Sequence, residues 1–300
     1  MLFRSGTAVA ATGLHLVYFI LRWIASGHIP VSNLFEFLTF LSLMVGIAFL
    51  VIFRIYGKPL LGAFALPVAF ILLSYAMVFP WEAQPLIPSL NSVWLYLHVT
   101  LAATGEAFFA IAFAAALMYL LRVIQYEGAG ERAQRFFMEI ILFAVLGVIG
   151  FIFANFTIRT NTVLNGLIIG AILYGGLWMI FRRPFGAVIQ RTLKEIDPDD
   201  LDEISYRAVA IGFPIFTLGA LIFAMIWAHI AWNRFWGWDP KEVWALVTWL
   251  FYSAYLHLRL GRGWQGRRSA WLAVVGFMVV LFTLIGVNLF IAGLHSYAGV

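Results

Sequence analysis

The feature that most constrains this chain is a series of apolar stretches, each about 20 residues long, separated by short polar breaks. An apolar helix of that length crosses the hydrocarbon core of a bilayer. Only 11% of the 300 residues are charged, whereas ordinary soluble domains carry roughly 25%. The sequence therefore predicts an all-α fold, a polytopic bundle of transmembrane helices.

Hydropathy predicts about nine spans within a single integral membrane domain, residues 1–300. The segment 7–24 is too long for the core of a cleaved signal peptide and has no small-residue cleavage site before the next loop, so we interpret it as a retained span. We interpret 136–181, which is nearly empty of ionisable groups, as an additional helix pair. The nine expected spans are 7–24, 34–53, 60–80, 93–121, 136–158, 162–181, 207–228, 241–258 and 270–292.

The basic residues are distributed unequally between the two sides of these spans. Fifteen of the 19 Lys and Arg residues fall in loops on one side. The positive-inside rule then predicts a cytoplasmic N-terminus and a C-terminus outside. The net charge of +5 is thus explained by topology and indicates no nucleic-acid partner. Cysteine is absent, which excludes disulfides, thiolate metal sites and thiol redox chemistry within this chain.

Histidines are concentrated at the expected outer ends of the spans: His28, His98, His229 and His295. A single histidine in such a place is usually interfacial or hydrogen-bonded, but ionisable groups at membrane depth mark functional sites. Paired imidazoles are the axial ligands of many six-coordinate haem irons. Toward the cytoplasmic ends lie His15 and His257, each either an inner ligand or a hydrogen-bonded interior histidine. Glu106, two helical turns from His98, is either functional or a protonated interior group.

The segment 229–257 is unusually rich in tryptophan. An interfacial aromatic belt is the simpler interpretation, but it predicts fewer tryptophans at one helix end. Flat indole faces can also stack on a porphyrin and shield it from water. The candidate residues are Trp232, Trp236, Trp238, Trp244 and Trp249.

Charged residues near the outer face have structural and functional interpretations. Asp239, Pro240 and Glu242 have the spacing of a helix start with a capping pair, and Asn33 to Glu36 repeats that spacing. Cations that could pair with anionic haem propionates are Arg22, Arg234 and Lys241, which otherwise are interfacial side chains that extend toward water.

The long tryptophan-rich stretch resembles the signature of haem-handling proteins in cytochrome c biogenesis: AWNRFWGWDPKEVWALVTWLFYSAYLHLR. Three further stretches narrow the resemblance to the CcsA/ResC branch of haem-attachment system II. They are HLVYFILRWIASGHIPVSNLFEFLTF, WLYLHV at 94–99 and GVNLFIAGLHSYA.

The resemblance implies a transporter that takes haem b from the cytoplasmic side to an outer site. There the haem is presented to the CxxCH motif of an apocytochrome c, within a holocytochrome c synthase complex. By matched position, His98 and His295 are the outer axial ligands, with the tryptophan segment and Asp239 around the ring. His257 is an inner ligand. The second inner ligand is His15 or comes from a CcsB/ResB-like membrane subunit. At His229, family members usually carry a non-ligand residue.

The resemblance also implies a setting and a division of labour. Thiol reduction falls to a separate partner, because this chain has no cysteine. A bacterial inner membrane is the expected location, with a thylakoid membrane as the alternative. Two other functions fit parts of the sequence. One is a bis-histidine haem b subunit for electron transfer, and the other is a solute transporter with an aromatic outer gate, which predicts no chromophore.

Overall fold

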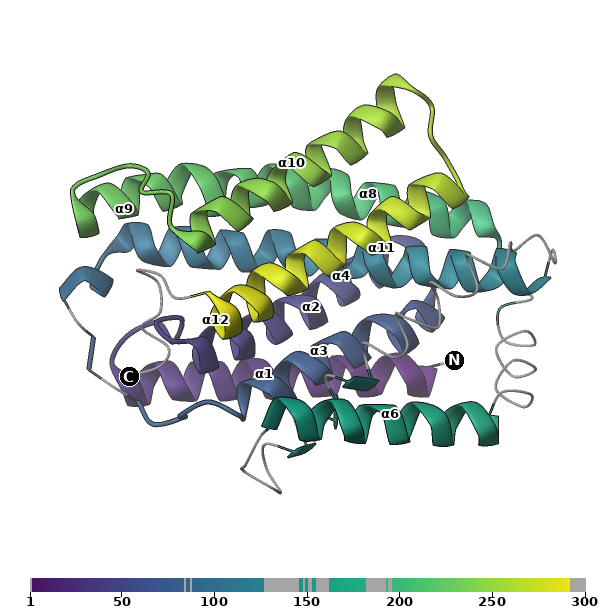
Figure 1. Ribbon diagram of the computed structural model, residues 1–300, viewed down its shortest axis with the longest axis horizontal. Coiled ribbons are helices and arrows are strands. Elements are labelled where there is room, and N and C mark those ends of the chain that lie inside the picture. The colour runs from purple at the N-terminus through teal and green to yellow at the C-terminus, as the bar shows by residue number, and fades with distance from the viewer. Residues whose placement is uncertain are drawn as a thin grey trace. The chain divides into compact units, whose positions relative to one another are not determined.

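The computed structural model describes residues 2–83, 85–86, 88–126, 146–147, 149–150, 153–154, 162–181, 193 and 196–291. Every regular element in these ranges is helical (Figure 1). Six segments are long and apolar enough to cross a membrane: Gly6–Ser26, Leu34–Tyr56, Pro59–Ala76, Val93–Val123, Pro198–Trp232 and Arg267–Gly286. The predicted all-α membrane fold is therefore confirmed.

The sequence predicts nine spans, three more than the six segments that meet the criteria of length and apolar character. The helices α6 (Thr162–Phe181) and α10 (Pro240–Gly261) coincide with two further predicted spans. α10 is not among the six, and the apolar part of α6 is the shorter stretch Leu164–Gly176. Most of the span predicted at 136–158 lies outside the described residues. The count of nine and the orientation of the termini stay predictions.

The chain divides into two compact units. The first comprises Met1–Leu117 and Asp202–Val300, and the second comprises Met118–Leu201. The predicted helix pair at 136–181 lies within the second unit. Its helix α6 meets a neighbouring segment through glycines: a Cβ built on Gly150 would lie 2.6 Å from the Gly170 nitrogen. Such contacts between small residues are typical of helix packing in membranes.

The first unit contains the remaining helices, except for the last turns of α4 and the first residues of α8, which belong to the second unit (Figure 1). α1 packs on α2, α2 on α3, and α10 on α11. The bounds are α1 Leu2–Ser26, α2 Leu34–Tyr56, η1 Pro59–Leu61, α3 Gly62–Ala76, η2 Pro88–Leu90, α4 Val93–Tyr126, α8 Pro198–Phe216, η3 Thr217–Phe223, α9 Ala224–Trp232, α11 Arg267–Leu281, η4 Phe282–Gly286 and α12 Val287–Phe290.

The helix starts predicted for α2 and α10 are confirmed. Asn33 is the N-cap of α2, and its side chain accepts a hydrogen bond of 2.9 Å from the Glu36 nitrogen. Asp239 is the N-cap of α10, where its carboxylate accepts from the Lys241 nitrogen and the Glu242 carboxylate accepts from the Asp239 nitrogen. Both caps satisfy backbone N–H groups that have no partner within the helix.

A buried ion pair joins the end of α1 to the start of α2. The Arg22 guanidinium lies 2.9 Å from Glu36 Oε1, and the Glu36 side chain is fully buried. The other carboxylate oxygen accepts from the Ser32 backbone nitrogen and hydroxyl. Arg22 also donates to the Trp81 carbonyl at 2.8 Å. Because most of α1 is exposed, this network is a principal attachment of α1 within the described residues.

Small residues allow α4 to approach α8 and η3 very closely. A Cβ built on Gly105 would lie 2.6 Å from Phe216 Cβ, and one built on Gly212 would lie 2.9 Å from the Gly105 carbonyl oxygen. No real Cβ is found this near another heavy atom. The two backbones therefore touch along this line, as at the small-residue interfaces of membrane helices.

We predict that Gly105→Ala destabilises the protein, because the added methyl group must displace the α8 backbone. Overpacking of this kind costs about 1–3 kcal/mol. Gly13→Ala is the matched control, since a Cβ at Gly13 in α1 would meet no atom within 4 Å. The midpoint of thermal unfolding, followed by tryptophan fluorescence, should fall only for Gly105→Ala. Equal midpoints for the two variants would refute the close contact.

Candidate functional site

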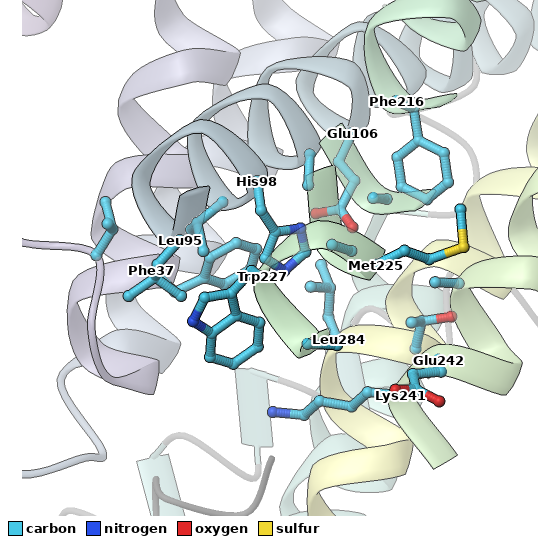
Figure 2. Close-up of a pocket in the computed structure, with 18 of the residues that line it drawn as sticks. Phe37, Leu95, His98, Glu106, Phe216, Met225, Trp227, Lys241, Glu242 and Leu284 are labelled. Carbon is cyan, nitrogen blue, oxygen red and sulfur yellow. The ribbon is translucent and has the colours of Figure 1, made fainter. Parts of the chain in front are cut away.

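A cavity of about 210 Å³ opens at the end of the first unit where α4 and α10 begin (Figure 2). This is roughly 15 to 20 times the space that one buried water needs, so the cavity is large enough for a ligand. Most of its lining is apolar. The lining residues that carry polar or aromatic groups are Ser32, Asn33, Phe37, His98, Glu106, Phe216, Trp227, Phe235, Trp236, Lys241, Glu242, Thr283 and Asn288.

His98 presents its imidazole to this cavity from the second turn of α4 (Figure 2). Its Nδ1 lies 2.9 Å from the Gly219 carbonyl oxygen. A carbonyl can only accept, so Nδ1 carries the hydrogen and the lone pair of the neutral ring is on Nε2. The ring stacks on Trp227 at 5.9 Å with an interplanar angle of 13°. A carbonyl that accepts a hydrogen bond from the other ring nitrogen typically orients a metal-binding histidine.

Two π-helical segments flank the cavity. η3 supplies the Gly219 carbonyl and Ala220, and η4 supplies Thr283 and Leu284. η3 follows shortly after Pro214, which lacks the N–H that would continue the helical hydrogen bonds. π-helical segments are rare and occur frequently at functional sites. Their occurrence on two walls of one cavity marks it as the candidate site.

The loop between α9 and α10 brings Trp236 to the cavity wall. The Glu242 carboxylate fixes this loop, because it accepts from the Gly237 nitrogen at 2.7 Å and the Asp239 nitrogen at 3.1 Å. Trp238 has a φ of +56° and is 70% exposed. A positive φ in a residue other than glycine costs energy and is often found at functional sites. Its ring meets Trp236 edge-on at 5.9 Å.

The other predicted tryptophans pack between helices rather than on the cavity wall. Trp232 meets Trp227 edge-on at 4.8 Å, and Trp244 packs against Phe282 of η4 at 4.4 Å. Trp249 donates from Nε1 to the Thr217 hydroxyl at 3.0 Å, which joins α10 to η3. Of the five tryptophans predicted from the sequence, Trp236 is the one that lines the cavity within the described residues.

The three candidate cations have different surroundings. Lys241 lines the cavity at the first turn of α10. Arg234 is exposed and covers Gly237, where a Cβ would lie 2.7 Å from the Arg234 Nε. Arg22 is committed to Glu36 and the Trp81 carbonyl and lies outside the cavity lining within the described chain. Of the three, Lys241 is best placed for an anionic group in the cavity.

The remaining histidines are dispersed. His28 lies in the α1–α2 loop, where its Nδ1 is 3.1 Å from the Ile29 carbonyl. His229 is exposed and stacks on Phe235 at 4.3 Å. His257 is exposed near the end of α10, and His15 lies on α1 with Tyr18 6.3 Å away. His15 and His257 therefore belong to different helix pairs, because α1 packs on α2 whereas α10 packs on α11 (Figure 1). His295 lies outside the described residues.

Sequence reasoning missed Trp227, which is buried and forms both the cavity wall and the stacking surface for His98. It lies two residues before His229. Side chains two apart on a helix point in nearly opposite directions, so Trp227 and His229 lie on different faces of α9 and meet His98 and Phe235, respectively. Because α9 is apolar on almost every face, its sequence gives no signal that Trp227 points inward.

The chain matches the family described as Cytochrome C assembly protein over residues 31–295. It is 37% identical to the cytochrome c biogenesis protein CcsA of Prochlorococcus marinus subsp. pastoris, over 93% of this chain and 77% of that protein. The protein of the same name from Gloeobacter violaceus is 34% identical over 99% of this chain and 87% of its own length. That from Synechococcus sp. is 36% identical, with 93% and 81% covered.

We predict that Glu242→Ala loosens the loop that holds Trp236, because two backbone N–H groups lose their acceptor. Losing a helix cap costs about 1–2 kcal/mol, so amide exchange in residues 233–241 should become faster by about tenfold. Hydrogen exchange read by mass spectrometry measures this directly. Glu203→Ala is the control, since Glu203 forms an exposed pair with Arg207 on α8. Unchanged exchange in Glu242→Ala would contradict the assigned role.

Proposed function

Because this chain belongs to the cytochrome c assembly protein family, as a CcsA-type protein, we propose that its outer cavity holds haem b for attachment to apocytochrome c. Family membership makes it a multi-pass membrane protein of cytochrome c biogenesis, a process that involves apocytochrome c. The proposal adds the cargo, the site and the acceptor motif CxxCH.

The orientation of His98 carries this proposal. Haem iron is bound by the lone pair of a neutral imidazole, and the Gly219 carbonyl selects the tautomer in which Nε2 carries that pair. The ring lies in an otherwise largely apolar cavity at a helix end. His295 is proposed as the second axial ligand from its sequence position alone, since it lies outside the described residues.

The rest of the cavity suits a flat amphiphilic ligand. Trp227 and Trp236 offer aromatic surface on two walls, and Lys241 offers a cation for a propionate. Trp238 is exposed beside Trp236, where it can cover a porphyrin edge or meet the incoming polypeptide. Asp239 acts indirectly as the α10 cap, and Arg22 acts through Glu36 and the α1–α2 attachment.

The reaction divides between cargo, acceptor and this chain. Haem b supplies two vinyl groups, across which the two CxxCH thiols add to form thioether bonds. This chain has no cysteine, so both thiols belong to the apocytochrome, and a separate partner keeps them reduced. The residues around the cavity bind the haem, orient it and exclude water.

The proposed topology has nine spans, with the N-terminus in the cytoplasm and the C-terminus outside. His257 then marks an inner haem site, because its 18-residue separation from Asp239 corresponds to roughly 27 Å of helix. Its exposed position on α10 leaves it accessible to a CcsB/ResB-like membrane subunit, which would supply the second inner ligand in place of His15. A bacterial inner membrane is the proposed location, and the cyanobacterial relatives keep a thylakoid membrane as the alternative.

We predict that His98→Ala loses an axial ligand from the outer haem, with a changed visible spectrum and reduced cytochrome c maturation. Added imidazole should partly restore both, because a small ligand can reach a cavity that opens at the outer face. His229→Ala should keep the spectrum, since His229 is exposed and stacks on Phe235. A normal spectrum in His98→Ala, or purified protein without haem, would refute the proposal.

We also predict an order of filling, inner site before outer site. Haem made in the cytoplasm meets His257 first, so His257→Ala should lower haem at both sites, whereas His98→Ala should leave inner haem in place. The measurement is the haem content and spectrum of each variant purified with its membrane partner. A fully occupied outer site in His257→Ala would mean that haem arrives by another route.

A further inference from the structure

Glu106 is a buried acid in the cavity that the proposed function does not use. It lies on α4, lines the same cavity as His98, and is 6% exposed (Figure 2). Its Oε2 is buried and has no hydrogen-bond partner within the described part of the chain. By contrast, the buried carboxylate of Glu36 is bonded through both oxygens. A polar group buried in this way normally has a functional reason.

The apolar surroundings of Glu106 make the ionised form of its carboxyl group energetically costly. The cavity that Glu106 lines is also lined by the apolar side chains of Phe216, Ala102, Val99 and Ala220. From α10, the Tyr252 hydroxyl interacts with it electrostatically, and this hydroxyl is also buried without a partner among the described residues. A carboxylate without hydrogen bonds is expensive in such a medium unless positive charge lies near.

Other titratable groups reach the same cavity from two helices. His98 lies on α4, and Lys241 and Glu242 lie at the start of α10. Glu242 is already bonded to two backbone N–H groups. The described lining residues from α2, η3 and η4 add no charged group. Glu106 is therefore the cavity carboxyl whose protonation can respond to a change of charge in the ligand.

We propose that Glu106 takes up one proton when the haem iron held by His98 is reduced, and releases it when the iron is oxidised. This inference rests on the proposed haem site. One electron enters the iron from an external one-electron reductant, and one proton from the bulk solvent enters the cavity and binds the Glu106 carboxylate. The positive charge lost by the ferric porphyrin is thus balanced within the cavity.

The size of the effect follows from the helix geometry. His98 and Glu106 are eight residues apart, which is roughly 12 Å of helical rise. One unit charge at that distance, with an effective dielectric constant of about 20, changes proton affinity on the order of tenfold. Reduction and protonation then favour each other, so a higher pH opposes reduction.

The test is a redox titration of the purified full-length protein with dithionite as reductant, at a series of pH values from neutral to mildly alkaline. The haem midpoint potential of the wild type should fall as pH rises. Glu106→Gln should remove this dependence, and Glu106→Asp should keep it. Glu106→Gln should also fold normally, because the amide is isosteric and carries no charge to bury.

A second readout is the redox-difference infrared spectrum, which does not depend on maturation activity. A carboxyl C=O band should appear on reduction in the wild type, vanish in Glu106→Gln, and change frequency in Tyr252→Phe. Tyr252→Phe keeps the ring that stacks on Phe109 at 3.6 Å and removes only the hydroxyl.

The outcomes separate this inference from the proposed function. A purified wild type without haem would remove the proposed function itself. Haem with a normal spectrum but a pH-independent potential would overturn only the role of Glu106. A pH dependence that survives in Glu106→Gln would assign the proton to another group, such as Lys241 or a haem propionate, and would also overturn it.

Discussion

The close approach of α4 to α8 and η3 underlies the whole candidate site. Gly105 and Gly212 let the two backbones touch, and this contact brings the Gly219 carbonyl to 2.9 Å from His98 Nδ1. In a membrane interior, where water does not compete, one such hydrogen bond contributes only about 0.6–2 kcal/mol. Its importance lies in selection, since it fixes both the direction of the imidazole and the nitrogen that carries its lone pair.

Two carboxylates at the cavity end of the first unit are held by several hydrogen bonds. Glu36 binds Arg22 and Ser32, while Glu242 binds the loop that carries Trp236. Glu36 and Glu242 occupy the same position in their helices, since each lies in the first turn, three residues after the N-cap residue. Both carboxylates therefore fix loops that border the cavity. Glu106 departs from this pattern, because its Oε2 has no hydrogen-bond partner among the described residues although the side chain lines the cavity.

Much of the chemistry was predictable because it depends on local pattern. The helix caps at Asn33 and Asp239 follow from short-range spacing, and the structure confirms both. His98 was singled out from its place near a helix end. The tryptophans were harder to interpret, since periodicity does not tell which neighbour a side chain meets. Trp244 and Trp249 join α10 to η4 and η3, whereas Trp227, which was not predicted, supports the His98 ring.

The sequence by itself determined an all-helical membrane protein, its cytochrome c biogenesis family, the capped helix starts and the candidate histidines. These follow from hydrophobic length, composition and motifs, which need no knowledge of distant contacts. Only the tertiary structure decided that His98 meets a carbonyl 121 residues away. It also decided that two π-helical segments flank one cavity. Finally, it decided that Arg22 pairs with Glu36 and does not line the described cavity wall. Each depends on how closely helices far apart in the sequence approach, and glycines permit that approach only where the facing surfaces fit.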